Sequence, residues 1–158
     1  MTEREIAAVV ERVLTERTPT KITLAMANAL IEKVKQQAIE LKVNAVIAVA
    51  DSSGNPIAIQ CMDRAYIASF DIALKKAFTS AALERSTYEL GRMSQPGQPL
   101  YGIQYTNDGK IVIFGGGEPL KVNGKVIGAI GVSGGLAEQD TALAAFGKKV
   151  FKEVFAWQ

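Results

Sequence analysis

The sequence predicts an α+β fold in which helices pack on an antiparallel sheet. Strand-like runs follow one another across short turns at Asp51–Asn55 and Asn123-Gly124, which is typical of β-hairpins. Apolar residues recur at spacings of three and four in several other segments, as in amphipathic helices. The chain has 158 residues, 48% of them hydrophobic, which suffices for one core but not for two ordinary domains.

The N-terminal segment from Thr2 to Glu16 predicts a short amphipathic helix. Its apolar residues follow a helical period: Ile6, Val9, Val10, Val13 and Leu14. Pro19 then interrupts the pattern, because proline breaks a helix and restricts the residue before it. We therefore expect a helical extension over residues 1–18 and a single domain over residues 19–158. A terminal helix of this kind often docks on a partner or on a second subunit.

A longer helix is expected to follow, with Thr20 as its N-terminal cap. Its inward stripe is predicted from the spacing of Leu24, Ala27, Ile31, Val34, Ala38 and Leu41, and is broadened by Ile22, Met26 and Leu30.

Two strands are predicted next, from Val43 to Ala50 and from Pro56 to Met62, as the arms of a hairpin. Cys61 lies in the second strand, where we expect a small buried side chain and not a reactive thiol. A third helix is predicted over 65–83. Its inward face is expected to contain Ile67, Phe70, Leu74, Ala77 and Ala81.

The segment from Arg85 to Asp108 is expected to be a long irregular loop of the kind that serves as a lid or an interface. A strand over Lys110–Phe114 is predicted after it. Further strands over 120–122 and 125–132 flank Asn123-Gly124, which favours a type I′ turn. A final helix over 138–155 completes the chain, with Leu143, Phe146, Val150 and Val154 turned inward.

Three consecutive glycines, Gly115, Gly116 and Gly117, follow the predicted strand at Phe114. They lack the helix of a dinucleotide fingerprint and the Lys-Ser/Thr of a phosphate-binding loop, and Glu118 would repel phosphate. A second glycine-rich run, 128–135, ends another strand. We expect both runs to line one pocket, where glycine leaves room for a flat or bulky ligand or for a neighbouring subunit.

Charge and composition exclude several functions. The net charge of +2 arises from 18 basic and 16 acidic residues dispersed along the chain, so we expect no nucleic-acid or membrane partner. The chain contains no histidine, which removes Ser-His and Cys-His catalytic pairs and His-ligated metal or haem. A single cysteine excludes an intrachain disulfide. No signal peptide or membrane span is evident, so we expect a cytoplasmic protein without a metal site.

Three runs together resemble the GlcG/HbpS family, which includes the C-terminal domain of PduO-type proteins: DSSGNPIAIQCMDRAYIAS, ALKKAFTSAAL and FGGGEPLKVNGKVIGAIGVSGGLAEQD. The resemblance covers about residues 20–151. It implies a profilin-like α/β/α fold with a five-stranded antiparallel sheet and flanking helices, and a homo-oligomer. It also implies that haem is a possible cofactor, and that the protein is an accessory to glycolate, propanediol or glycerol utilisation.

The resemblance also marks candidate ligand-binding residues. Those that match motifs of the family are Met62, Asp63, Lys76, Thr79, Gly115, Gly116, Pro119, Ser133, Gln139 and Asp140. Three further candidates are chosen by their position or chemistry: Gly117, Tyr101 and Tyr105. Arg64 stands where the family commonly has glycine. Without histidine, a haem iron would need Tyr, Met or Cys, so the identity of any cofactor stays open. The residues with suitable chemistry are Cys61, Met62, Tyr66, Met93, Tyr101 and Tyr105.

Several of these residues have a structural alternative. Asp63 either contacts a ligand or caps the following helix at Tyr66 or Ile67. Lys76 either holds a ligand carboxylate or forms a surface ion pair with Asp71 or Glu84. Met62 and the two tyrosines are equally explained by packing. Gln139 and Asp140 suit the first turn of a helix, where acceptors are favoured.

Three functions remain open from the sequence. The first is a non-catalytic, oligomeric binding protein whose pocket takes a planar cofactor, such as haem, or a small metabolite. The second is an enzyme for a small carbonyl or hydroxy compound with Asp63 as acid and base, against which the absence of histidine weighs. The third is a structural or accessory subunit that docks through its N-terminal helix.

Overall fold

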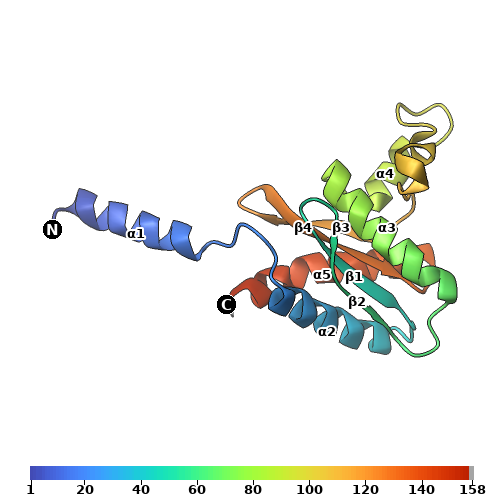
Figure 1. Ribbon diagram of the computed structural model, residues 1–158, viewed down its shortest axis with the longest axis horizontal. Coiled ribbons are helices and arrows are strands. Elements are labelled where there is room, and N and C mark those ends of the chain that lie inside the picture. Colours follow the sequence, from blue (N-terminus) through green and yellow to red (C-terminus); the bar gives the residue numbers. More distant parts are fainter. Residues whose placement is uncertain (157–158) are drawn as a thin grey trace.

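The computed structural model describes the backbone of residues 1–156 and the side chains of residues 1–14 and 18–155, arranged as helices on both faces of one antiparallel sheet (Figure 1). The described strands are β1 (Val46–Asp51), β2 (Pro56–Cys61), β3 (Gly117–Val122) and β4 (Lys125–Ser133). They lie in the order β2-β1-β4-β3, and each pair of neighbours is antiparallel. The predicted fold class is therefore confirmed.

The described sheet has four strands, so the five-stranded sheet implied by the family resemblance is wrong for this chain. Residues 110–114, predicted as a strand, form none. The Thr79 hydroxyl accepts a hydrogen bond from the Val112 amide at 3.0 Å, so a helix side chain satisfies a backbone group that a strand would pair within the sheet. The strand begins instead at Gly117, within the predicted glycine loop.

Both predicted hairpins are present. The β1–β2 hairpin turns at Asp51, whose Oδ1 accepts from the Ser53 and Asn55 amides at 2.9 Å. The β3–β4 hairpin turns at Asn123 and Gly124, which have φ values of 50° and 77°. Two positive φ angles in succession are the signature of a type I′ turn, as the Asn-Gly pair predicts.

Helices α2 (Leu24–Glu40) and α5 (Ala137–Ala156) cover one face of the sheet and form the larger core cluster with it. Thr23, and not Thr20, caps α2, because its hydroxyl accepts from the Met26 amide at 3.1 Å. This start places Met26 and Leu30 inside. Leu24 and Leu41, expected inside, are exposed.

Helix α3 (Ile67–Leu83) crosses the other face, where Ala73 and Ala77 pack on Val46, Ala48 and Ala50 of β1. The contact is close, since a Cβ on Gly131 of β4 would lie 2.1 Å from the Ala73 carbonyl oxygen. Small residues make this approach possible. Ile67 and Phe70 were predicted to face inward, and this prediction was wrong. Ile67 is 97% exposed and Phe70 is 46% exposed.

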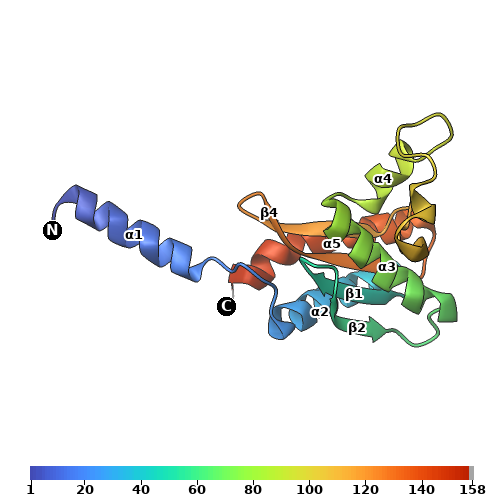
Figure 2. The ribbon, with the colours of Figure 1, turned by 45° about the horizontal axis from the view of Figure 1, so that its top comes forward.

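The segment 85–108 is more regular than expected. It contains α4 (Thr87–Met93) and a short 3₁₀ turn at Ile103–Tyr105, with another at Asn107–Gly109. The Ser86 hydroxyl caps α4 by accepting from the Glu89 amide at 3.1 Å. Figure 2 shows α4 and the turns after it at one end of α3, beside the sheet and not over it.

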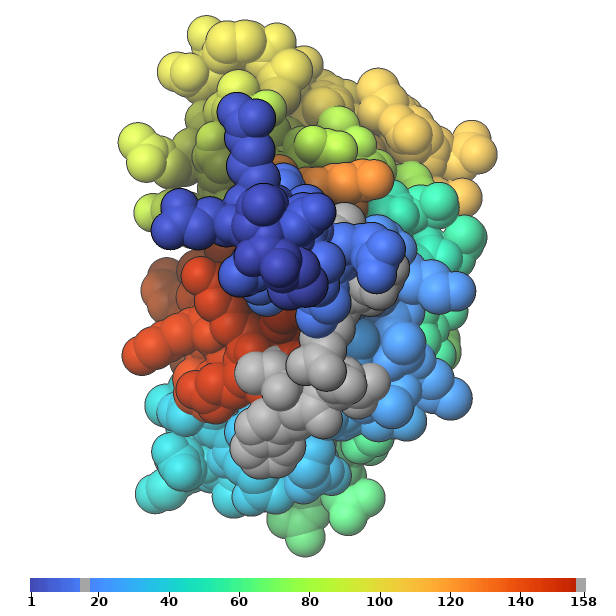
Figure 3. Space-filling model, turned by 90° about the vertical axis from the view of Figure 1, so that its left-hand side faces the viewer, coloured from blue at the N-terminus to red at the C-terminus, as the bar shows by residue number. Residues whose placement is uncertain are grey.

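Helix α1 (Glu3–Arg17) confirms the predicted N-terminal helix and stands away from the body (Figures 1 and 2). Figure 3 looks onto the end of the molecule from which α1 projects, where parts of α2 and α5 are also at the surface. No helix in the described part of the chain is long and apolar enough to cross a membrane.

Candidate functional site

A buried ion pair lies beneath the glycine loop. Lys76 of α3 has no exposed surface, and its Nζ donates to Asp140 Oδ2 of α5 at 2.9 Å and to the Val132 carbonyl oxygen of β4 at 2.8 Å. The Phe114 ring lies over the same ammonium, with its centroid 5.0 Å from Nζ. Lys76 therefore joins two helices, one strand and the loop before β3.

Burial makes the charged form of Lys76 less favourable than it is in water. Desolvation by burial lowers the pKa of the Lys76 amine, and the nearby Asp140 carboxylate only partly offsets this effect. Asp140 is itself fully engaged, because its Oδ1 accepts from the Gly135 amide at 2.8 Å. The predicted surface ion pair of Lys76 is wrong, since Lys75 takes that role with Asp71 at 2.9 Å. In this conformation no ligand reaches the Lys76 amine.

The three glycines lie against the chain's own side chains. A Cβ on Gly115 would lie 1.8 Å from Thr141 Oγ1, and one on Gly116 would lie 2.6 Å from Lys76 Nζ. Gly117 is similarly enclosed and donates its amide to Thr87 Oγ1 at 2.9 Å. The space beside this loop is thus occupied by α3, α4 and α5. A ligand-binding role for the glycines and for the buried Pro119 stays a prediction.

Other predicted residues lie near the same buried layer. Thr79 Oγ1 donates to the Lys75 carbonyl oxygen at 2.7 Å while it accepts from Val112. Ser133, at the end of β4, shares a 3.1 Å hydrogen bond with Ser69 of α3. Gln139 Oε1 accepts from the Leu136 amide at 2.8 Å at the start of α5. The structure gives each of these side chains a packing or capping partner.

The remaining predicted residues lie elsewhere. Met62 and Asp63 line a depression of about 350 Å³ along β2, together with the exposed thiol of Cys61 and with Lys35. Cys61 was expected to be buried, so that prediction is wrong, because β2 is an edge strand. Asp63 is not the N-cap residue of α3; Tyr66 takes that position, and no side-chain hydrogen bond caps the helix. Tyr101 and Tyr105 are 67% and 83% exposed.

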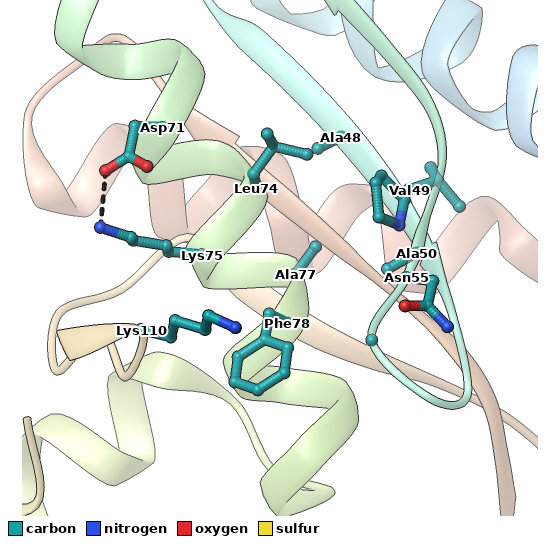
Figure 4. A pocket seen from close by; sticks show the side chains of 12 residues that line it. Ala48, Val49, Ala50, Asn55, Asp71, Leu74, Lys75, Ala77, Phe78 and Lys110 are labelled. Carbon is teal, nitrogen blue, oxygen red and sulfur yellow. Dashed lines mark ion pairs between the residues drawn. The ribbon is translucent and has the colours of Figure 1, made fainter. Parts of the chain in front are cut away.

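A different pocket, of about 310 Å³, opens between α3 and the β1–β2 hairpin (Figure 4). One side is formed by β1 and the hairpin turn, the other by α3, and Lys110 lies at the rim. The lining residues are Ala48, Val49, Ala50, Gly54, Asn55, Pro56, Asp71, Leu74, Lys75, Ala77, Phe78 and Lys110. None of them was predicted as a site residue. The pocket exists because α3 alone covers this face of the sheet. The alanine-rich sequence of α3 does not show that a pocket would form there.

The two lysines at this pocket, Lys75 and Lys110, differ in whether a carboxylate neutralises them. Lys75 is neutralised by Asp71, as the dashed line in Figure 4 marks. Lys110 pairs with no carboxylate in the described part of the chain, and its Nζ lies 5.6 Å from the centroid of the Phe78 ring. The Phe78 ring packs closely against Gly54, since a Cβ at position 54 would lie 2.7 Å from the ring. An apolar pocket with one unpaired cation suits an apolar molecule with an anionic group.

Metal binding finds no support in the geometry. Among the residues that the structure describes, no three His, Cys, Asp or Glu side chains come together as a possible metal site.

The family model for the haem degrading protein HbpS-like matches residues 22–148. The chain belongs to the HbpS-like family. The predicted relationship to GlcG and HbpS is thereby confirmed. An uncharacterized 15.0 kDa protein from the dhaT-dhaS intergenic region of Citrobacter freundii is 48% identical over 133 residues, which are 84% of this chain and 94% of that protein.

Two solved structures of similar sequence agree with this chain in fold. The Klebsiella pneumoniae protein ORFY superposes with a TM-score of 0.80 at 46% identity, over 83% of this chain and 90% of that one. The PduOC:heme complex superposes with a TM-score of 0.78 at 34% identity, over 82% of this chain and 94% of that one. The match to the family model begins at Ile22, after α1.

Proposed function

We propose that this HbpS-like chain is a non-catalytic binding protein whose pocket between α3 and the β1–β2 hairpin takes a small apolar molecule with a carboxylate or similar anionic group. The observation that supports this proposal is Lys110, an unpaired cation at the rim of an otherwise apolar pocket. The volume of about 310 Å³ lies at the lower end of the range for small-molecule sites, which favours a metabolite over a complete macrocycle.

Haem fits this pocket only in part. The apolar lining and Lys110 suit a porphyrin edge and its propionate, but no lining residue is a Tyr, Met, Cys or His that could bind iron. Haem ligation is therefore a second candidate at the depression along β2. The observation that favours it there is the exposed Cys61 thiol, with the Met62 side chain and Lys35 beside it.

An enzyme with Asp63 and Lys76 as joint catalytic residues receives no support. Lys76 is sealed by its own partners, whereas Asp63 lies at the exposed end of β2. A role as a homo-oligomeric accessory to small-diol or glycolate metabolism is compatible with the binding function. That role rests on the family and on relatives such as the protein of the dhaT-dhaS intergenic region.

The binding proposal is tested with 8-anilinonaphthalene-1-sulfonate, an apolar anion whose fluorescence rises when it leaves water. Saturable binding to the wild-type protein is expected to weaken about tenfold in Lys110→Gln, which corresponds to about 1.4 kcal/mol. Lys75→Gln is the matched control and should change affinity less than threefold, because Asp71 already neutralises Lys75. Equal affinities of all three proteins would refute the site.

A haemin titration followed by the Soret band separates the two candidates. A band lost in Cys61→Ala but kept in Lys110→Gln would place haem at the β2 depression. A band unaffected by either variant would exclude both sites for haem.

A further inference from the structure

The apolar stripe of α1 is exposed along its length. Five of its members are 40–61% exposed: Ile6, Val9, Val10, Val13 and Leu14. The helix is nonetheless well specified locally, because Thr2 and Glu5 form a reciprocal capping box in which each accepts from the other's amide. A helix of 15 residues is only marginally stable alone in water and gains most of its stability from packing. Packing of the stripe against another surface would therefore stabilise α1.

Helix α1 is not part of the folded core. Neither hydrophobic cluster of the described residues includes any α1 side chain, and the family match begins at Ile22, after the helix. The residues between α1 and α2 contain Pro19 and form no regular element. The helix is thus an addition to a complete domain, joined to it by a short linker.

The same end of the body carries an apolar groove. Its volume is about 570 Å³, and it lies between the last turns of α5 and the tip of the β3–β4 hairpin. The lining residues are Lys121, Val122, Asn123, Gly124, Lys148, Phe151, Lys152 and Phe155. Val122 and Phe155 are only partly buried although both pack on the core. The groove therefore leaves apolar surface in contact with water.

The groove and the stripe complement each other in charge. Lys121 and Lys152 pair with no carboxylate in the described part of the chain, whereas Lys148 is bound to Glu118. Helix α1 is acidic in its first turn, and at 100° per residue Glu5 flanks the apolar stripe while Glu3 lies within its arc. Apolar residues spaced three and four apart are the usual anchors by which a helix occupies such a groove.

We infer that α1 of one copy docks its apolar stripe in the α5/hairpin groove of a second copy. In Figures 1 and 2, α1 leaves the end of the body that carries the groove and points away from it. Val10 and Leu14 line a depression with Asn123 of the same chain, but that depression includes none of the stripe residues Ile6, Val9 and Val13. A two-fold axis beyond this end lets two chains exchange their helices and covers both stripes and both grooves at once. Such reciprocal exchange is a common route to a closed dimer.

The test is disulfide trapping between two full-length chains in a Cys61→Ser background. One chain contains Val13→Cys in the stripe, and the other, enlarged by a tag, contains Lys152→Cys at the groove. After mixing and mild oxidation we expect a covalent heterodimer. The matched control is Ala8→Cys, on the opposite side of α1, which should give at least fivefold less product.

A further variant separates docking from folding. Val10→Asp in the Val13→Cys chain should reduce the covalent heterodimer at least fivefold and leave the near-UV circular dichroism spectrum of the domain unchanged, because α1 contributes nothing to the core.

The proposal is overturned if a chain with both Val13→Cys and Lys152→Cys closes an intrachain disulfide and stays monomeric, which would mean that α1 folds back on its own groove. It is also overturned if Ala8→Cys links as efficiently as Val13→Cys, or if no heterodimer forms. In that last case, hydrogen exchange that slows in α1 only when a different protein is added would identify a different partner for the helix. None of these outcomes depends on the ligand pocket of Figure 4, which lies against α3.

Discussion

The ammonium of Lys76 lies 2.9 Å from the carboxylate of Asp140, although the two residues are 64 positions apart in the sequence. The pair connects helices on opposite faces of the sheet around the end of β4, where Val132 contributes its carbonyl oxygen. Glycine is required above it, because any side chain on Gly116 would collide with the ammonium. The glycine loop and the ion pair therefore form one buried unit.

Replacing one partner of this pair is expected to destabilise the fold strongly. Lys76→Met leaves the buried Asp140 carboxylate without its cation, which should lower the free energy of unfolding by about 3–5 kcal/mol. Urea denaturation measures the change. The control is Lys75→Met, which removes a partly exposed ion pair and should cost at most about 1 kcal/mol.

The double variant Lys76→Met/Asp140→Leu should recover most of the lost stability, since it removes the isolated charge as well. Equal unfolding free energies for Lys76→Met and Lys75→Met would contradict the role assigned to the buried pair.

Stability should depend on alkaline pH through Lys76. Its pKa in the folded protein is lowered from 10.5 by burial, so between the folded value and 10.5 the unfolded chain binds more protons. The contribution of Lys76 to stability therefore increases as pH rises through this window and is smallest below it. We expect the difference in unfolding free energy between wild type and Lys76→Met to grow as the pH approaches 10.5 from below. A difference that shrinks over this range would show that the pKa is raised instead.

Gly116→Ala should be among the most damaging glycine replacements. Its φ of 120° disfavours any side chain, and the new Cβ would lie 2.5 Å from the Val132 carbonyl oxygen. We expect a loss of at least about 3 kcal/mol, of which about 1–3 kcal/mol is backbone strain. Gly97→Ala is the control, because its φ of 83° is equally unfavourable but no atom lies within 4 Å of the new Cβ. Similar melting temperatures for both variants would argue against close packing at Gly116.

The thiol of Cys61 should react freely in the folded protein. It is exposed on the edge strand β2, so we expect 5,5′-dithiobis-(2-nitrobenzoate) to modify one thiol per chain at a rate within about threefold of that in urea. If the thiol reacts at least 100 times more slowly in the folded protein than in urea, Cys61 is buried, as the strand pattern predicted.

Local chemistry was sufficient to predict the two hairpins and the helices α1, α2, α3 and α5. Asn123-Gly124 specifies its turn because few residues other than Asn, Asp and Gly tolerate two successive positive φ angles, and the structure shows both. The helical segments follow from apolar spacing, and the family motifs confirmed the fold class. The first turn of α2 differed, since Thr20 and Thr23 are both able to cap a helix, and α4 was missed because its segment was predicted as a loop.

The candidate site was less predictable, because burial is decided by neighbours distant in the sequence. The adjacent residues Lys75 and Lys76 look equivalent, yet α3 turns one toward solvent and the other into the layer above β4. The bulky Ile67 and Phe70 suggested the inner face of α3, whereas the close approach of Gly131 selects the alanine face. The pocket of Figure 4 lies between α3 and the β1–β2 hairpin, and no pattern in the sequence predicted it.

The sequence by itself determined the two hairpins, the helices α1, α2, α3 and α5, and the family, because turn chemistry, hydrophobic period and motifs act over short distances. The tertiary structure alone decided that Lys76 meets Asp140, that Val112 bonds to Thr79 instead of joining the sheet, and that Cys61 faces solvent. These outcomes depend on which surfaces remain after the helices have packed. No local pattern contains that information.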